Sequence, residues 1–490
     1  MWNKSTLLLQ KKMAGAAFLT AFVAVVILCV WAAAISGYYF IAAAPIVALV
    51  VYISIVDFSY LYWLLIASIP FSTEIYLPNG LGTDLPTEPL IIGLMLLFGV
   101  FVLRNIRHLS ADILRHPLTL LLILHLAWIF ISTLTSDLFV VSFKFFLAKV
   151  WYVSTFFFLT AYLVRDERDF KRFFWVFFWP FITVTMIIFT RHGIAGFSFM
   201  DIHAIMHPFQ RNHVNYAAAL SLFFPFLLFA RHWYAKGSKR KWLLTLASIF
   251  VFVAIYFTYT RAAYIALIIA LGAYYVIRWK LMRHTLVLAS IVIIAGVWNL
   301  VDNSKYLDFA PNFDRTISHN NFDNLIEATY KMEDISTMER VYRWVAAGQM
   351  MPERPLLGWG PGNFVNFYKS FTVTSFQTYV SDNPEKSGPH SYFFMTLVEQ
   401  GLIGFLIFVV FLFAIFIRGE RLYHRLSKHP FRQQVVMTCL LSTVIISAFL
   451  LINDLIETDK IGSFFFINLA VIIRQDLFLF RLPRKKNNEP

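Results

Sequence analysis

The sequence predicts an all-α polytopic membrane protein, and three observations lead to that prediction. Hydrophobic residues fill 59% of the 490 positions, charged residues fill only 14%, and the mean hydropathy is +0.65, far more apolar than a soluble domain of this size. Apolar runs long enough to cross roughly 30 Å of hydrocarbon recur along the chain. The basic residues gather in alternate connections between these runs. We expect about twelve to fourteen transmembrane helices and one long extracytoplasmic loop that contains short helices.

The apolar runs define the expected membrane spans. They cover residues 14–35, 38–56, 58–70, 89–103, 117–134, 144–163, 171–190, 213–231, 241–259, 262–278, 284–300, 391–417, 434–453 and 461–480. The runs at 58–70 and 89–103 are short for a full crossing, which leaves the count open. The first run follows two lysines, as a signal sequence would, but it is too long for a cleaved signal and leads directly into further spans. We expect it to be retained.

The net charge of +14 follows the membrane pattern and does not indicate nucleic-acid binding. With a cytoplasmic N-terminus, the inside segments hold 28 of the 42 Lys and Arg residues, as the positive-inside bias predicts. Segment 302–389 then lies outside, and its eleven carboxylates against eight Lys and Arg exclude a basic nucleic-acid surface. We expect membrane lipids around the chain, both termini in the cytoplasm, and no nucleic-acid partner.

The chain is expected to have four parts. These are a transmembrane bundle at 1–301, an extracytoplasmic loop domain at 302–389, C-terminal transmembrane helices at 390–480 and a cytoplasmic tail at 481–490. The two cysteines, Cys29 and Cys439, lie in apolar runs, which excludes a disulfide framework and a Cys-x-x-Cys metal site. Neither a metal nor a cofactor is expected.

The clearest candidate for chemistry is His390. It ends the polar segment 302–389 and opens the run at 391–417, so it stands where a large outside segment meets the bilayer. Imidazole titrates near neutral pH. Such a position suits it to take a proton from a substrate held at the membrane surface.

Two further candidates lie on a predicted helix at about 336–350. Residues 336–339 have capping-box spacing and helical periodicity follows them, and Arg340 and Arg343 fall on one side of that helix as candidates to bind an anion. Glu339 and Arg343 are also spaced for an ordinary ion pair that faces water, which is the alternative. Farther on, Gly360 belongs to a turn with three glycines in five residues. That turn allows either a close approach to a ligand or simply a tight bend, and its spacing is not that of a phosphate loop.

Other candidate arginines stand at outside membrane edges. Arg211 precedes the run at 213–231, and Arg261 lies in the turn before the run at 262–278, with Tyr259 beside it as a candidate to bind substrate. Arginines at a membrane edge usually extend to lipid headgroups, and Arg191 with His192 is a weaker candidate pair.

Four candidates share one side of the bilayer in the predicted topology: Arg211, Arg261, Arg340 and His390. A shared site for a phosphate or diphosphate is therefore the stronger interpretation, because the planar guanidinium binds phosphate oxygens through two nitrogens.

In their order, these residues resemble a known family. The resemblance rests on Arg211 ahead of Asn215 and Ala217, Thr260-Arg261-Ala262, Glu339-Arg340 with Trp344 downstream, Pro355-Leu356-Leu357-Gly358-Trp359-Gly360, and His390 followed by Glu399-Gln400-Gly401-Leu402-Ile403-Gly404. This arrangement, over roughly residues 205–410, resembles the O-antigen ligase and O-antigen polymerase family of bacterial envelopes. The N-terminal third agrees only in being a set of membrane spans.

The resemblance implies a metal-independent glycosyltransferase in the bacterial inner membrane, with its active site facing the periplasm or exterior. The donor would be an undecaprenyl-diphosphate-linked glycan, held by Arg211 and Arg261, and His390 would position or deprotonate the acceptor hydroxyl. The acceptor is left open among another glycan, a lipid A core (as in lipopolysaccharide) and a protein. Several family members carry Asn or a second histidine near the catalytic one, whereas Ser391 follows here, so the acceptor side departs from the pattern.

A membrane transporter of an anionic solute is the alternative from another class. Many spans and an intramembrane cation cluster also suit an anion pathway. Against it, the hydropathy pattern has no inverted repeat, and the candidates gather on one face instead of at the midplane.

Overall fold

The computed structural model of the chain describes residues 4–38, 41–42, 44–76, 82–107, 111–309, 335–376, 381–383 and 386–481. The expected tail at 481–490 therefore lies almost entirely outside the described residues. The chain divides into two compact units, Met1–Leu65 and Ile66–Pro490. In the first unit are α1 (Lys4–Ser36) and α2 (Ala44–Asp57), while α3 (Ser59–Ser68) crosses the boundary. Every candidate residue named above belongs to the second unit.

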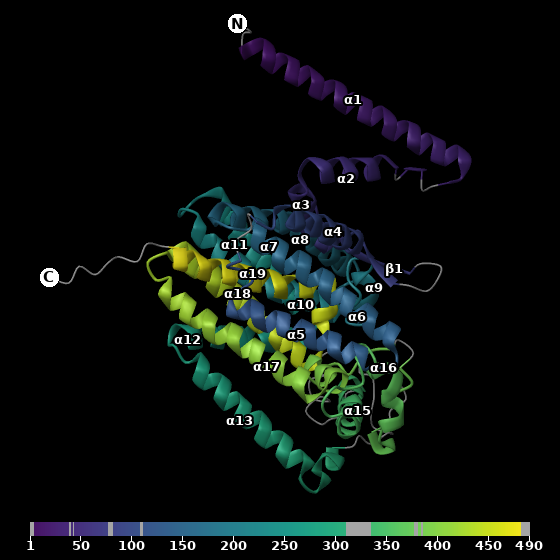
Figure 1. Ribbon diagram of the computed structural model, residues 1–490, viewed down its shortest axis with the longest axis vertical. Helices are drawn as coiled ribbons and strands as arrows, with labels where there is room; N and C mark the ends of the chain where they lie inside the picture. The colour runs from purple at the N-terminus through teal and green to yellow at the C-terminus, as the bar shows by residue number, and fades with distance from the viewer. Residues whose placement is uncertain are drawn as a thin grey trace, which may run out of the picture. The chain divides into compact units, whose positions relative to one another are not determined.

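Long helices make up most of the second unit (Figure 1). They are α4 (Thr87–Asn105), α5 (Pro117–Leu134), α6 (Phe139–Tyr152), α8 (Glu167–Ile194), α10 (His213–Ala230), α11 (Lys239–Tyr256), α12 (Arg261–Arg278), α13 (Met282–Val301), α17 (Tyr392–Arg425), α18 (Pro430–Ile452) and α19 (Asp459–Arg481), and the short helix α7 (Thr160–Leu163) follows α6. A π-helix, Val153–Leu159, joins α6 to α7. The shorter elements are β1 (Thr73–Tyr76), β2 (Gly82–Leu85), α9 (Ile202–Met206), α15 (Ile335–Met350) and α16 (Phe364–Phe367), with 3-10 turns at Ile69–Phe71, Arg231–Trp233, Asp302–Phe309, Met351–Glu353, Tyr368–Phe371, Thr374–Phe376 and Leu455–Glu457.

The predicted all-α polytopic membrane fold is confirmed. Each expected span overlaps a helix, and within the described ranges ten helices are long and apolar enough to cross a membrane. The stretches Thr20–Ser36 and Ser59–Phe71 are shorter apolar helices. The short run at 89–103 proves to be part of the 19-residue helix α4, which is one of the ten. By contrast, α2 and α11, which begins with three basic residues, are not among them.

Burial separates the inner helices of the second unit from the outer ones. In α18 and α19, 78% of the apolar stretch is buried, against 0% in α13. Phenylalanine rings fill the interior: Phe464 of α19 lies 4.7 Å from Phe177 of α8 and 6.0 Å from Phe223 of α10, ring centre to ring centre. Such edge-on contacts are favourable for aromatic pairs. The exposed apolar surface of α13 is suited to contact with lipid.

Successive long helices of the second unit alternate in direction, so their connections fall at two ends. One end, called the loop end here, contains residues 73–76, 82–86, 135–138, 195–212, 257–260, 302–309, 335–376, 381–383, 386–391 and 453–458. Figure 1 shows β1, α9, α15 and α16 together at this end. Tyr392 N donates to Asn453 O at 3.2 Å, and Tyr259 Oη donates to Phe197 O at 2.8 Å. These bonds join connections that are far apart in sequence.

The loop end also contains a small antiparallel sheet of β1 and β2, which the sequence did not predict. Both strands have four residues and no apolar run, so no strand pattern was visible. Glu74 pairs directly with Asp84 across the sheet. Burial, followed by the negative charge of Asp459 and smaller effects of Glu88 and Glu74, raises the pKa of Asp84 from 3.8 to about 7.

Candidate active site

His390 lies directly before α17, at the loop end. Its side chain is half-buried and its backbone is left-handed, with a φ of 52°. Few residues other than glycine adopt this conformation, and those that do are held there by their surroundings. Burial, followed by the positive charges of Arg340 and Arg343, lowers the pKa of His390 from 6.5 to about 3. The imidazole is therefore neutral near pH 7 and able to accept a proton.

The predicted helix at about 336–350 is present as α15. Its capping box is wrong in detail, because the helix already includes residue 335 and Ser336 lies inside it. Glu339 uses its carboxylate elsewhere: Oε1 accepts a hydrogen bond from Ser381 Oγ at 2.7 Å. The helix is thereby connected to the segment that leads to His390.

The two arginines of α15 have different surroundings. Arg343 Nη2 lies 3.4 Å from Glu339 Oε2, and the two side chains are only 5% and 10% exposed. The i,i+4 pair is thus present, but the expectation that both residues face water is wrong, since the pair is enclosed by the loop end. Arg340 is half-buried, and its Nε donates to Ile452 O at 3.3 Å. Arg340 therefore reaches from α15 to the end of α18.

The turn that carries Arg261 is attached to the start of α10. Tyr259 has a left-handed backbone with a φ of 51°, and its hydroxyl is engaged with Phe197 O. Thr260 Oγ1 lies 3.5 Å from His213 O. Arg261 then begins α12. These contacts hold Arg261 beside the first turn of α10.

Arg211 lies two residues before α10. Its side chain is 55% exposed, and its Nε is 4.0 Å from Glu74 Oε2, a contact that contributes little at an exposed position. Asn212 caps the helix, because its side chain accepts a hydrogen bond from Asn215 N at 2.9 Å. The cap holds Arg211 close to the positive end of the helix, where anions are favoured.

Hydrogen bonds bring the starts of these helices together. Thr260 Oγ1 lies 3.5 Å from His213 O, and Arg340 Nε donates to Ile452 O, next to Asn453, whose carbonyl accepts from Tyr392 N. The positive charge of Arg340 interacts electrostatically with both His390 and His213. Arg261 also acts on His213. A continuous group therefore runs from Arg261 at the start of α12, across the start of α10, to His390 at the start of α17.

Arg211 joins the same group through Asp454, which lies between α18 and α19. Burial raises the pKa of Asp454, and the charges of Arg211 and Arg343 oppose that rise. One carboxylate oxygen of Asp454 would lie only 2.6 Å from a Cβ added to Gly388. We call Arg211, Arg261 and Arg340 the cation edge.

The two weaker candidates, Arg191 and His192, form hydrogen bonds with the segment 195–212. Arg191 Nη1 donates to His207 O at 2.6 Å, and His192 Nε2 lies 3.0 Å from Ser198 O. Both contacts use backbone carbonyl groups of that segment. No contact described for Arg191 joins it to the cation edge.

Gly360 packs against protein. A Cβ added to Gly360 would lie 2.4 Å from Ser136 Oγ, and one added to Gly358 would lie 2.5 Å from the backbone of Glu399. Opposite them, α17 is broken at Gly401, where φ is 70° and ψ is −178°, and a Cβ there would lie 2.2 Å from Leu356 O. We call residues 355–364, together with the break in α17, the interlocked turn.

Hydrogen bonds explain why the two glycine motifs meet. The break leaves backbone groups of α17 without helical partners, and an unpaired group in a membrane costs several kcal/mol. The turn supplies the partners through three bonds: Trp359 N to Val398 O at 3.0 Å, Gly360 N to Glu399 O at 2.9 Å, and Leu402 N to Pro355 O at 2.7 Å. The Glu399 carboxylate in turn accepts from Gly362 N at 2.8 Å and Phe364 N at 3.0 Å. The tight-bend interpretation of Gly360 fits these contacts.

Two residues of this site were missed from the sequence. His213 follows Arg211 closely, and its Nδ1 is buried with no hydrogen-bond partner in the part of the chain that is described. Its ring lies 4.5 Å from the ring of His203. The sequence feature that could have identified His213 is its position as the first residue of the 213–231 run, on the same predicted membrane side as His390. Asp454 could have been identified in the same way, because it lies in the predicted outside connection between the runs at 434–453 and 461–480.

The site combines exposed or half-buried guanidinium groups with a neutral imidazole. Guanidinium groups bind phosphate oxygens strongly, and a neutral imidazole accepts a proton. Over the described residues, no group of three or more His, Cys, Asp and Glu side chains is arranged to hold a metal ion.

Comparison with known sequences adds one match. Residues 246–409 match the family described as O-Antigen ligase, which is about a third of the chain. The matched range includes Arg261, α15, the interlocked turn and His390. It begins after Arg211, which therefore lies outside the match. No curated protein matches the chain.

Proposed function

The match of residues 246–409 assigns the chain to the O-antigen ligase and polymerase family of glycosyl-transferring membrane enzymes, and on this premise we propose that it transfers or polymerises an undecaprenyl-diphosphate-linked glycan onto an acceptor hydroxyl. The observation that supports this proposal is the position of the cation edge and His390 at neighbouring helix starts of the loop end, joined by the contacts Thr260–His213, Arg340–Ile452 and Tyr392–Asn453. We propose that the loop end faces the periplasm or exterior of a bacterial inner membrane. The basic connections at the other end favour that orientation.

The cation edge would hold the donor diphosphate. Arg211 and Arg261 stand at the positive ends of α10 and α12, where helix dipoles also favour negative charge. Arg340 approaches from α15. Fixed cations stabilise a diphosphate most when charge develops on it, as the bond from sugar to phosphate breaks.

His390 would act on the acceptor. In the proposed step the acceptor oxygen forms a bond to the anomeric carbon, and the bond from that carbon to the phosphate oxygen breaks. The electron pair leaves with the diphosphate, and the acceptor proton passes to His390. No metal or cofactor enters this step.

Donor binding would improve His390 as a base. In the free protein, burial and the charges of Arg340 and Arg343 hold its pKa at about 3, low for a base that works near neutral pH. A bound diphosphate adds negative charge beside Arg340. That charge would raise the pKa of His390 towards a useful range, so proton removal would become efficient only with donor in place.

The remaining candidates take other roles in this proposal. Gly360 and Arg191 support the backbone, Tyr259 fixes the Arg261 turn, and His213 joins the donor side next to Arg261. The acceptor is another glycan, a lipid A core or a protein, and the expected division into bundle, loop domain, C-terminal helices and tail belongs to the same proposal.

The deciding experiment incubates the purified protein with an undecaprenyl-diphosphate glycan and each class of acceptor, and identifies the product by mass. A ladder of chains on lipid identifies a polymerase, and a capped lipid A core or protein identifies a ligase. Vesicle uptake of an anionic solute without any glycan transfer would instead support the transporter and end this proposal.

A further inference from the structure

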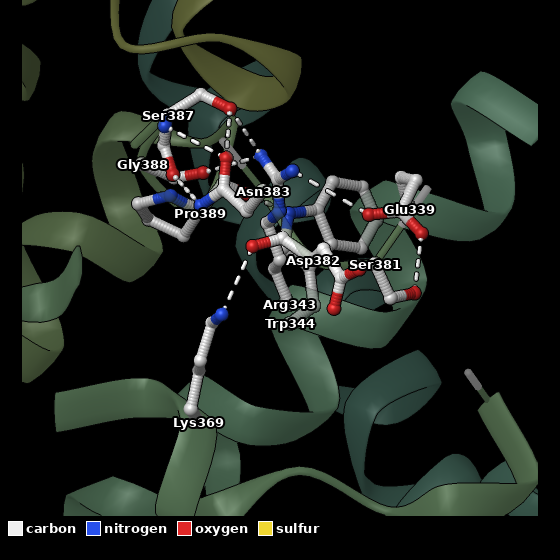
Figure 2. Close-up of polar contacts among 10 residues, drawn as sticks. All are labelled: Glu339, Arg343, Trp344, Lys369, Ser381, Asp382, Asn383, Ser387, Gly388 and Pro389. Carbon is white, nitrogen blue, oxygen red and sulfur yellow. Dashed lines mark hydrogen bonds and ion pairs between the residues drawn. The ribbon is translucent and has the colours of Figure 1, made fainter. Parts of the chain in front are cut away.

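The segment that leads to His390 is held by side chains of α15, as Figure 2 shows. Arg343 Nη1 donates to Ser387 Oγ at 2.8 Å and to Gly388 O at 3.1 Å. Trp344 Nε1 donates to Pro389 O at 2.8 Å. The two carbonyl groups that precede His390 are therefore both fixed by adjacent residues of one helix.

Both terminal nitrogens of Arg343 are engaged, whereas its buried Nε has no hydrogen-bond partner among the described residues. Its other terminal nitrogen pairs with Glu339, which Ser381 orients, and only 5% of the side chain is exposed. A guanidinium whose ends both point into the protein cannot receive a substrate phosphate without giving up these bonds. This contrasts with the half-exposed Arg211 and changes the role expected of Arg343.

Trp344 connects both sides of His390. Its ring lies 5.5 Å from that of Phe394 at an angle of 23°, so one face packs on the first turn of α17 while the indole N–H holds Pro389. Asn383 fixes the segment from the other direction: its Oδ1 accepts from Ser387 N at 2.9 Å, and its Nδ2 donates to Ser387 O at 3.0 Å.

The backbone of His390 needs such support. A φ of 52° is unfavourable for a residue with a side chain, and it persists only where surrounding contacts hold it. Those contacts come from α15 before His390, and from Tyr392 N to Asn453 O after it.

We propose that Arg343 and Trp344 are positioning residues that hold His390 in its left-handed conformation and aim its imidazole at the acceptor. The positive charge of Arg343 also lowers the pKa of His390. This proposal rests on the proposed function of His390. The charged groups that act on His390 are Arg340 and Arg343 from α15. Glu339 is paired with Arg343, and Asp454 lies beside Gly388.

Three variants separate positioning from charge. Trp344→Phe keeps the ring on Phe394 and loses the N–H, and Arg343→Lys keeps the charge and loses the fork. For both we expect turnover to fall about 10- to 100-fold, as misplacement of a reacting group does, with an unchanged KM for the donor and an unchanged pH profile. Arg343→Gln also removes a charge that lowers the pKa of His390, so the acidic limb of the pH profile should move to higher pH.

The controls are Trp298→Phe on the exposed face of α13 and Arg168→Gln at the opposite end of the bundle, and melting temperatures report folding. A purely structural role for Arg343 would reduce the amount of folded protein and leave the pH limb in place. Wild-type turnover in Trp344→Phe, a changed donor KM, or an unmoved limb in Arg343→Gln would overturn the proposal. If His390→Ala is itself fully active, the proposed function fails; if His390→Ala is inactive while these variants behave as wild type, only the positioning proposal fails.

Discussion

The cation edge and the interlocked turn were both candidate ligand sites from sequence, and they differ in what their atoms contact. At the cation edge, Arg211 is 55% exposed, and its Nε is 4.0 Å from Glu74 Oε2. In the interlocked turn, Gly360 and Gly401 have protein atoms within 2.4 Å of where a Cβ would lie. The first region has room for a partner, and the second is filled by the chain itself.

The difference shows how two kinds of short motif are to be interpreted in this protein. A charged side chain at the start of a membrane helix has water or headgroups as its surroundings, so a ligand can replace them. A glycine cluster beside a helix break serves the unpaired backbone of that break. We therefore expect substitutions at the cation edge to change donor binding, and substitutions in the interlocked turn to change folding.

The largest effect is expected at His390, whose charged neighbours include Arg340 of the cation edge. His390→Ala should reduce glycan transfer about 100- to 10,000-fold, the usual range for loss of a general base, with an unchanged melting temperature. Product mass measures the transfer. His284→Ala, an exposed histidine at the start of α13, is the control, and undiminished transfer by His390→Ala would remove this residue from the mechanism.

Arg261→Lys tests the cation edge next. The charge remains but the planar fork is lost, so the KM for the donor should rise about 10- to 100-fold. The matched control is Arg278→Lys at the other end of α12, where Nη1 donates to Tyr274 Oη at 3.1 Å. Donor titration measures both. Equal donor affinity in Arg261→Lys and wild type would argue against a diphosphate clamp.

Gly401→Ala tests the interlocked turn. A Cβ would overlap Leu356 O, and φ is already 70°, so the melting temperature should fall by roughly 3–10 °C. Donor affinity of the protein that folds should stay unchanged. Gly99→Ala in α4, where no atom lies within 4 Å, should melt as wild type does. A weaker donor affinity in Gly401→Ala with an unchanged melting temperature would reverse the comparison.

The smallest effect is expected in the hairpin next to Arg211. The pKa of Asp84 is raised to about 7, so the folded state binds this proton more tightly than the unfolded state. Its stabilising effect is complete below about pH 4 and is lost as the pH rises through 7. Asp84→Asn should therefore flatten the fall in melting temperature between pH 5 and 8 by about 3 °C or less. Identical pH profiles for both proteins would contradict the raised pKa.

Hydropathy alone predicted the long helices, because a membrane span must be both helical and apolar over a fixed length. The same reasoning could not reach β1 and β2, which have no apolar run, or the break at Gly401, which lies within a continuous apolar stretch. That break depends on contacts with residues more than 35 positions away. Local sequence carries no trace of such contacts.

For the site, the sequence predicted that Arg211, Arg261, Arg340 and His390 lie on the same side of the membrane, and in the structure they all lie at the loop end. The sequence could not predict that the Arg343 side chain is buried while Arg340, three residues earlier, contacts the end of α18. Helical spacing places both on one side of α15, and the contacts of Ser381, Ser387 and Gly388 with Glu339 and Arg343 make the difference between them. Their roles in transfer stay predictions.

The left-handed backbone at position 390 also decides which amino acids that position tolerates. Glycine and asparagine adopt a positive φ easily, whereas valine, isoleucine and threonine do so only with strain. In a library of all substitutions, scored separately for protein abundance and for glycan transfer, abundance should favour glycine and asparagine while transfer should favour histidine alone. Loss of transfer in His390→Asn would then report on the imidazole, whereas the same loss in His390→Val would mix chemistry with misfolding.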